Sequence, residues 1–229
     1  MEEISGKQPV KRKRGLATAN AILEAAAELF AQCGYDGVTL RDLAHKVGIR
    51  ESSIYSHFQS KADILETLYG IFIREVPDTR PSDTLLDEML EALQPEEIFR
   101  RILFHVGEHV KGILSNTAMI INHEKFKNQR AADMYYRYVV SEPASYYERL
   151  IGKMISRGMV GPVDARLFAE QYNYISIALT KEYIMAQYGF ADARAVVAYM
   201  IRTLQFFCGQ MKLCVGAADE TKDTTSTHS

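Results

Sequence analysis

Cysteine is scarce in this chain, which has three among 229 residues. Cys33, Cys208 and Cys214 are odd in number and lack the close spacing of metal ligands. A disulfide framework and a zinc cluster built on cysteine are therefore not expected. We interpret the three as reduced thiols in a cytoplasmic protein.

Long apolar runs are also missing. No stretch approaches the roughly 20 apolar residues that a membrane-spanning helix requires. The N-terminus carries basic residues without an apolar stretch behind them, so it does not resemble a secretory signal. We therefore expect no membrane among the partners of this protein.

Signatures of common enzyme classes are absent, with one exception. The chain has no nucleophile elbow, phosphate-binding loop or dinucleotide fingerprint. His105, Glu108 and His109 spell H-x-x-E-H, a zinc-peptidase pattern in which both imidazoles share a helix face. A third ligand is not evident, and the pair is equally suited to lining a cavity or bonding within a core. We expect no catalytic residue, metal or cofactor, and keep a metal-dependent hydrolase as an alternative.

The net charge of −2 conceals an uneven distribution. Residues 1–61 contain nine Lys or Arg and seven Asp or Glu, whereas the remainder is acidic. Lys11, Arg12, Lys13 and Arg14 form a basic cluster in a stretch, residues 1–16, that we expect to be disordered. Such an arm can follow a DNA backbone or enter a minor groove. The alternative is a solvated, mobile tail.

The segment from Thr39 to Lys61 carries the clearest functional signal. Thr39 and Asp42 have the spacing of a helix-capping pair, and Gly48 allows a tight turn. A second helix is expected from Arg50 to Phe58, in which only Ile54 and Phe58 face inward. Short or hydrogen-bonding side chains remain for its outer face, as a helix placed in the major groove of DNA requires: Ser52, Ser53, Tyr55, Ser56 and His57.

At this point the chain resembles a known family. The run A-I-L-E-A-A-A-E-L-F-A-Q-C-G-Y-D-G-V-T-L-R-D-L-A-H-K-V-G-I, followed by I-Y-S-H-F-Q-S-K-A-D-I-L, is similar to the DNA-binding domain of the tetracycline-repressor (TetR) family. The resemblance extends from about Ala21 to Leu65, roughly a fifth of the chain. The rest resembles the family only in length and helical character.

The resemblance assigns roles to individual residues. Tyr55, His57 and Lys61 match positions that commonly contact phosphates in the family, and Thr39 matches a position where cap and phosphate contact coincide. Side chains from about Arg50 to Ser56 would then read bases. Arg50 departs from the family pattern, because a capping Ser or Thr is usual there. It is free instead to reach a phosphate or a guanine edge.

The remainder is expected to be helical, with no strands. Helices are predicted from Ser60 to about 74 and at about 19–33, 83–93, 95–114, 117–127 and 130–157, the last bent or interrupted at Pro143. The final pair, 164–188 and 193–213, is apolar over more than half of its circumference, which calls for burial on two sides. A four-helix interface between two copies satisfies this, and the resemblance implies it as well. Burial within one large core is the alternative.

The body is rich in Tyr, Phe and Met, and by resemblance it would enclose an inducer pocket. Aromatic rings with polar tips suit a mostly apolar ligand with a few hydrogen-bonding groups. As lining residues we nominate His105, His109, Tyr147 and Tyr172.

Together these features predict an all-α protein with an N-terminal three-helix, helix-turn-helix DNA-binding domain and a larger C-terminal helical domain for ligand binding and dimerisation. The expected boundaries are 1–16 for a basic arm, 17–63 for the DNA-binding domain, 64–216 for the body and 217–229 for a disordered tail. The predicted function is a ligand-responsive regulator, of the repressor type, that binds a palindromic double-stranded DNA operator as a homodimer. A structural or recruiting DNA-binding factor without an inducer is the alternative.

Overall fold

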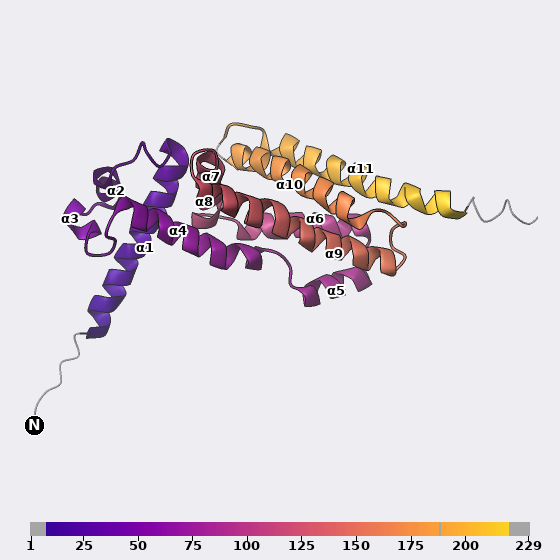
Figure 1. Ribbon diagram of the computed structural model, residues 1–229, viewed down its shortest axis with the longest axis horizontal. Coiled ribbons are helices and arrows are strands. Elements are labelled where there is room, and N and C mark those ends of the chain that lie inside the picture. Colours follow the sequence, from indigo (N-terminus) through magenta and orange to yellow (C-terminus); the bar gives the residue numbers. More distant parts are fainter. Residues whose placement is uncertain (1–7, 188, 220–229) are drawn as a thin grey trace, which may run out of the picture. The chain divides into compact units, whose positions relative to one another are not determined.

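The computed structural model describes residues 8–187 and 189–219, with side chains for 15–186 and 189–211. All regular structure in these residues is helical (Figure 1), which confirms the all-α prediction. None of the described helices combines the length and apolar character needed to cross a membrane. Internal packing divides the chain into two compact units, residues 8–77 with 110–135 and residues 78–109 with 136–219.

The first unit is built around the N-terminal helix. It contains α1 (Gln8–Cys33), α2 (Leu40–Val47), α3 (Glu51–Ile54), α4 (Lys61–Glu75), α7 (Ile113–Glu124) and α8 (Gln129–Met134). Helix α1 contacts α2, α4 and α7, and α7 also contacts α4. The core of this unit is formed by α1 to α4. Its largest fully buried side chains are Ile22, Phe30, Leu43, Ile54, Ile64, Leu68, Tyr69 and Phe72.

Helix α1 begins well before the start at Ala19 that the apolar periodicity predicts. It includes residues 8–16, which we expected to be disordered. Pro9 is compatible with a first helical turn, and the Lys and Arg residues that follow are good helix formers. The periodicity argument missed this extension because the stretch carries too few apolar residues to show a face.

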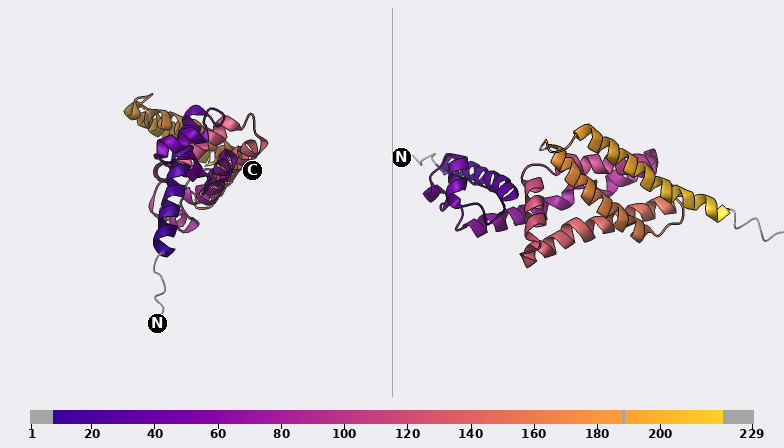
Figure 2. Two further views of the ribbon diagram at one scale, coloured as in Figure 1. Left: turned by 90° about the vertical axis from the view of Figure 1, so that its left-hand side faces the viewer. Right: turned by 90° about the horizontal axis from the view of Figure 1, so that it is seen from above.

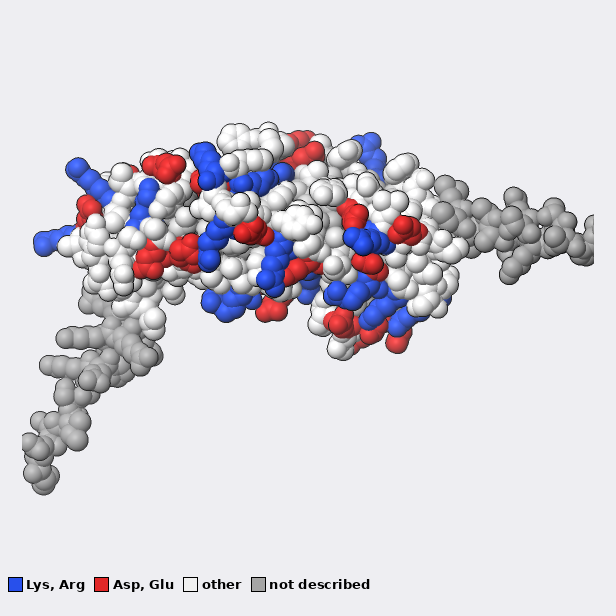
Figure 3. Space-filling view, in the orientation of Figure 1, with Lys and Arg blue, Asp and Glu red and all other residues white. Residues whose placement is uncertain are grey.

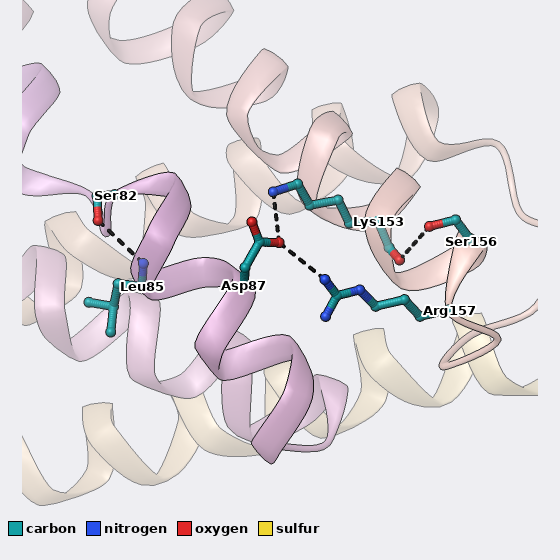
Figure 4. Close-up of polar contacts among 6 residues, drawn as sticks. All are labelled: Ser82, Leu85, Asp87, Lys153, Ser156 and Arg157. Atoms are coloured by element: carbon teal, nitrogen blue, oxygen red, sulfur yellow. Dashed lines mark hydrogen bonds and ion pairs between the residues drawn. The ribbon is translucent and has the colours of Figure 1, made fainter.

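The second unit packs its long helices side by side. It contains α5 (Asp83–Ala92), α6 (Pro95–His109), α9 (Glu142–Ser156), α10 (Ala165–Gln187) and α11 (Ala193–Asp219). Helix α10 contacts both α9 and α11, and α11 contacts α6 (Figures 1 and 2). Asp87 of α5 accepts from Lys153 Nζ at 3.0 Å and from Arg157 Nη2 at 3.2 Å, which ties α5 to the end of α9 (Figure 4).

Two helix boundaries differ from the sequence-based expectation. Helix α6 ends at His109 instead of continuing to Leu114, because Gly112 adopts a left-handed φ of 58° that an α-helix cannot contain. Helix α11 continues to Asp219, past the expected end at Leu213 and into the predicted tail. Residues 220–229 of that tail lie outside the described residues.

The predicted interruption near Pro143 is present as a π-helical segment. It spans Tyr135–Ser141, between α8 and α9. Proline has no N–H to donate to the carbonyl four residues earlier, which belongs to Val139. Asn173 of α10, only 3% exposed, donates its Nδ2 to the carbonyls of Val139 at 3.2 Å and Val140 at 3.0 Å. Local proline chemistry therefore sets the position of the irregular turn, and a buried amide from another helix satisfies it.

Candidate nucleic-acid interface

Thr39 and Asp42 form the capping box predicted from their spacing. Asp42 N–H donates to Thr39 Oγ1 at 3.2 Å, and Thr39 N–H donates to Asp42 Oδ2 at 2.8 Å. The Thr39 hydroxyl also donates to Asp42 Oδ2 at 2.6 Å, and these side-chain and backbone hydrogen bonds lower the pKa of Asp42. The Thr39 side chain is exposed, but its proton is committed to the cap. Its first role is therefore to fix the start of α2.

The turn between α2 and α3 closes on Gly48. This residue has a φ of 73°, in the left-handed region, and the Ile49 N–H donates to the Ala44 carbonyl at 3.0 Å. Such a closure satisfies the last carbonyls of α2 and redirects the chain sharply. Glycine suits the position, because any other side chain would be strained there.

Arg50 occupies the N-cap of α3 without a capping hydrogen bond from its side chain. The missing cap inferred from the sequence is therefore confirmed. The guanidinium is exposed, as is the carboxylate of Glu51 in the first turn. Both side chains are available to an external partner.

The second helix is shorter than the nine residues predicted. Helix α3 covers only Glu51–Ile54, and residues 55–57 form a turn. The Ser56 hydroxyl donates to the Ser53 carbonyl at 2.7 Å, the acceptor that the His57 N–H would use in a continuing helix. The His57 N–H instead donates to the Ile54 carbonyl at 2.9 Å. This is the known competition of serine side chains with helix hydrogen bonds.

The division into inward and outward side chains nevertheless follows the prediction. Ile54 is 0% and Phe58 7% exposed, so these two anchor the segment to the first unit. The Tyr55 ring is 56% exposed on the outer side. Ser52 and Ser56 are also exposed, while Ser53 and His57 are half-buried. A β-carbon placed on Gly15 would lie 3.9 Å from His57 Cε1, so the imidazole lies beside α1.

Lys61 makes contacts that the sequence did not suggest. Its Nζ donates to the carbonyls of Tyr35 and Val38, both at 2.8 Å, and lies 4.2 Å from the centre of the Tyr35 ring. The ammonium thereby holds the loop between α1 and α2, directly before the capping residue Thr39. Two of its three N–H donors are used, and one remains for a phosphate.

Charges of both signs are interspersed on the face shown in Figure 3, where no extended patch of one sign is visible. The predicted basic cluster, Lys11 to Arg14, falls in the helical stretch of α1, but its side chains lie outside the described residues.

In the second unit, the structure brings two of the four nominated effector residues together. Tyr147 and Tyr172 lie with their ring centres 4.5 Å apart, nearly perpendicular, inside an aromatic cluster with Phe99 and Phe207. Burial raises the pKa of Tyr147 to about 12 and that of Tyr172 well above its ordinary value. Both phenols are therefore neutral donors at physiological pH.

His105 and His109 occupy a different part of the second unit. Their rings stack on α6 with centres 4.1 Å apart, and His109 Nδ1 is 2.7 Å from the His105 carbonyl oxygen. Burial and the neighbouring His109 lower the pKa of His105. Within the described residues, no three His, Cys, Asp or Glu side chains gather as metal ligands. The described residues thus do not supply the third ligand that the hydrolase alternative needs.

An open cleft of about 420 Å³ lies between the π-helical segment and α10. Its lining includes Tyr136, Tyr174 and Asn173, together with Arg166 and Glu170, which form an ion pair at 3.1 Å. Sequence reasoning missed this cleft, because the proline that generates the irregular turn and the asparagine that supports it are far apart in the chain.

An all-helical fold with an exposed, polar helix-turn-helix segment defines a DNA-binding regulator. Residues 22–68 match the family model described as bacterial regulatory proteins, tetR family. Residues 22–68 therefore form a DNA-binding domain of the TetR type, which confirms the resemblance seen in the sequence. The family that this domain matches consists of regulatory proteins and not of enzymes, in line with the expectation from the sequence.

Two curated relatives show how far the likeness extends. The nucleoid occlusion factor SlmA of Vibrio campbellii is 29% identical over 154 residues, 66% of this chain and 75% of that protein. IcaR of Staphylococcus aureus, a negative transcriptional regulator of the biofilm operon icaADBC, is 49% identical over 45 residues. That match covers 20% of this chain and 24% of IcaR, so it concerns a single domain.

Solved structures extend the likeness to both units. A gamma-butyrolactone receptor described as ArpA-like is similar with a TM-score of 0.54 at 19% identity. The similarity covers 84% of this chain and 97% of that one. At this identity it establishes a shared fold.

Proposed function

We propose that this protein is a ligand-responsive transcriptional repressor that binds a palindromic operator as a homodimer in the cytoplasm. The observation that carries the proposal is the outward display of Ser52, Tyr55 and Ser56 over the buried anchors Ile54 and Phe58. A short segment held in this way can enter a major groove without losing its own support. Repression is favoured because the relative with 49% identity in this domain, IcaR, is a negative regulator.

Two kinds of DNA contact are assigned within the interface. Thr39, Tyr55, His57 and the remaining N–H of Lys61 would bind phosphates and set the register. Base reading falls to Arg50 and to Ser52, Ser53 and Ser56. The serines are exposed or half-exposed and short enough for close approach, and Arg50 is exposed and long enough to reach into the groove. The uncapped Arg50 suits a guanine edge, where its planar guanidinium can donate two hydrogen bonds.

The homodimer is proposed to form through α10 and α11. Both helices bury one face in the second unit, yet large apolar side chains remain on the other face. Leu167 and Tyr174 on α10 are 50% and 57% exposed, and Tyr199 and Phe206 on α11 are 49% and 71% exposed. Exposed apolar side chains spaced seven residues apart on each helix support an interaction surface here. A two-fold axis through such a surface would pair two DNA-binding units for a palindrome.

The effector is proposed to be a small, mostly apolar molecule that binds the second unit and releases the DNA. The aromatic cluster around Tyr147 and Tyr172 supports this assignment, since rings with polar tips suit such ligands. A ligand shifts DNA affinity only if it favours one arrangement of the dimer over another. Its effect on operator affinity is therefore the quantity to measure.

Selection of bound duplexes from a random DNA pool tests the proposal directly. A palindromic consensus with half-sites about one helical turn apart is expected. Tyr55→Ala should weaken binding to the consensus and to unrelated duplexes alike, since phosphate contacts carry no sequence information. Arg74→Ala, at an exposed position paired with Glu75, is the control and should bind as the wild type does. Recovery of no enriched sequence would contradict the proposal.

A DNA-binding factor without an inducer is the second candidate. It is favoured by the relative that matches two thirds of this chain and is named a nucleoid occlusion factor rather than an operon regulator. The two candidates differ in one measurement. A small molecule that raises the melting temperature and releases the operator supports the repressor, whereas tight DNA binding that no ligand alters supports the second candidate.

A further inference from the structure

Arg80 is the unusual cation of the second unit. It follows the short 3₁₀ turn at Val76–Thr79, precedes Pro81, and is half-buried. It forms no hydrogen bond or ion pair with any residue that the structure describes. Arg100, the other half-buried arginine of this unit, instead grips Glu97 through two hydrogen bonds of 2.8 and 2.7 Å. A guanidinium taken partly out of water without an anion is costly and calls for a partner.

Neighbouring carboxylates do not satisfy this charge. Burial lowers the pKa of Arg80, and the nearby Glu142 only partly opposes that effect. Glu142 itself pairs with Arg137, whose Nε donates to it at 2.9 Å. The guanidinium carbon of Arg80 lies 5.8 Å from the centre of the Tyr146 ring. The Tyr146 hydroxyl in turn donates to the Pro81 carbonyl at 3.3 Å, which holds the arginine against the aromatic ring.

A continuous series of rings leads from Arg80 into the core. The centres of Tyr146 and Tyr147 are 5.4 Å apart, those of Tyr147 and Tyr172 4.5 Å, and those of Tyr172 and Phe207 5.2 Å. The series is charged at one end and apolar at the other. A molecule bound along this series would meet a cation at one end and apolar rings at the other, which suits an anionic group on an apolar body.

At the inner end of the series lie two buried hydroxyl groups. Tyr172 and Ser176 lie one turn apart on α10 and face the cluster. The Ser176 hydroxyl lies close to those of Tyr147 and Tyr172, yet neither Tyr172 nor Ser176 has a well-formed hydrogen bond to a described residue. Leaving buried donors unpaired costs about 1–3 kcal/mol each, so the cluster is not optimised for packing alone.

We propose that the effector of this regulator is an amphipathic carboxylic acid, whose carboxylate pairs with Arg80 and whose apolar body lies among the rings of Tyr147 and Tyr172. The carboxylate is chosen because a planar guanidinium binds it through two parallel hydrogen bonds. The inference rests on the proposed function for its biological meaning. The ligand class and the role of Arg80 belong to this inference alone, and both can be tested without DNA.

The test compares acids with their neutral analogues. Decanoate, dodecanoate and 2-naphthoate are titrated by calorimetry against the full-length protein, each beside its primary amide. At least one acid is expected to bind about tenfold more tightly than its amide, the value of one charged hydrogen-bonded pair. Arg80→Gln should abolish this preference while leaving the affinity for the amide unchanged, and Arg80→Lys should retain part of it.

Arg149→Gln is the matched control. Arg149 is an exposed arginine of α9 in the same region, its only described bond being a donation to the Ser145 carbonyl at 3.3 Å. This variant removes an equal charge and should keep the full preference for acids. The proposal is overturned if none of the three acids binds, if acids and amides bind equally, or if Arg80→Gln keeps the preference.

Operator binding without ligand, measured for the wild type and Arg80→Gln, separates this inference from the proposed function. Equal DNA affinity of both proteins is expected, because Arg80 is not part of the DNA-binding segment. If the wild type selects no DNA sequence, the proposed function fails whatever the acids do. If it binds DNA but prefers no acid, only the present inference fails.

Discussion

Asn173 donates its side-chain amide to the carbonyl of Val139, the acceptor that Pro143 leaves without an α-helical partner. The same amide reaches the Val140 carbonyl, so one buried side chain of α10 satisfies two carbonyls of the π-helical segment. This relationship couples α10 to the start of α9, and it shapes the cleft flanked by Tyr136 and Tyr174.

We expect Asn173→Ala to lower the free energy of unfolding by about 1–3 kcal/mol, because a buried amide and its hydrogen bonds to two part-buried carbonyls are lost. In a Pro143→Ala background the loss should be smaller by roughly 1 kcal/mol, since the alanine that replaces the proline can supply an N–H to the Val139 carbonyl. Urea unfolding of the four proteins in this double-mutant cycle measures the coupling. Strict additivity of the two changes would show that the amide and the proline act independently.

Features that depend on neighbours in the chain could be predicted from the sequence. Thr39 and Asp42 form the expected capping box, and Ile54 and Phe58 face inward, because both patterns follow from helical spacing alone. The family resemblance identified the fold in the same way, because its motif lies within one continuous stretch of sequence.

Features that depend on contacts distant in the chain could not be predicted. The grip of Lys61 on the Tyr35 and Val38 carbonyls joins residues 26 and 23 positions apart. The contact of Arg80 with Tyr146 joins a loop, which no periodicity describes, to α9. The early end of α3 had a local cause, the Ser56 hydroxyl, but serine is equally common on helix surfaces, and its bond to the Ser53 carbonyl is visible only in three dimensions.

Lys61→Met tests whether its ammonium reaches DNA as well as the loop. Methionine keeps most of the apolar stem but removes three donors, so the free energy of unfolding should fall by about 1–3 kcal/mol. If the third donor binds a phosphate, the slope of log affinity against log salt should also become shallower by about one unit. Operator titrations from about 50 to 200 mM salt measure this slope. Weaker binding with an unchanged slope would mean that Lys61 acts only by positioning the loop.

Phe206→Asp should convert the proposed homodimer into monomers, because a carboxylate within the proposed interface would have to be buried without a partner. Stability of the monomer should change little, as this ring is 71% exposed on α11. Sedimentation at micromolar concentration measures the state of assembly. Phe126→Asp, which alters an 84% exposed ring of the first unit, is the control and should leave the dimer intact. A Phe206→Asp protein that remains dimeric would contradict the proposed interface.

The contribution of Glu97 to stability should be lost at acid pH. Hydrogen bonds from Arg100 and Arg101 lower the pKa of Glu97 from 4.5 to about 2. A carboxyl group whose pKa is lower in the folded state adds stability above its unfolded pKa, and this contribution disappears as pH falls through the folded value. Wild type should therefore exceed Glu97→Gln in stability above about pH 4.5, and the advantage should vanish near pH 2. Its size should be about 1 kcal/mol at most, since the pair is partly exposed and screened by water. Urea unfolding of both proteins at intervals between these pH values measures the difference, and a difference that does not depend on pH would refute the assignment.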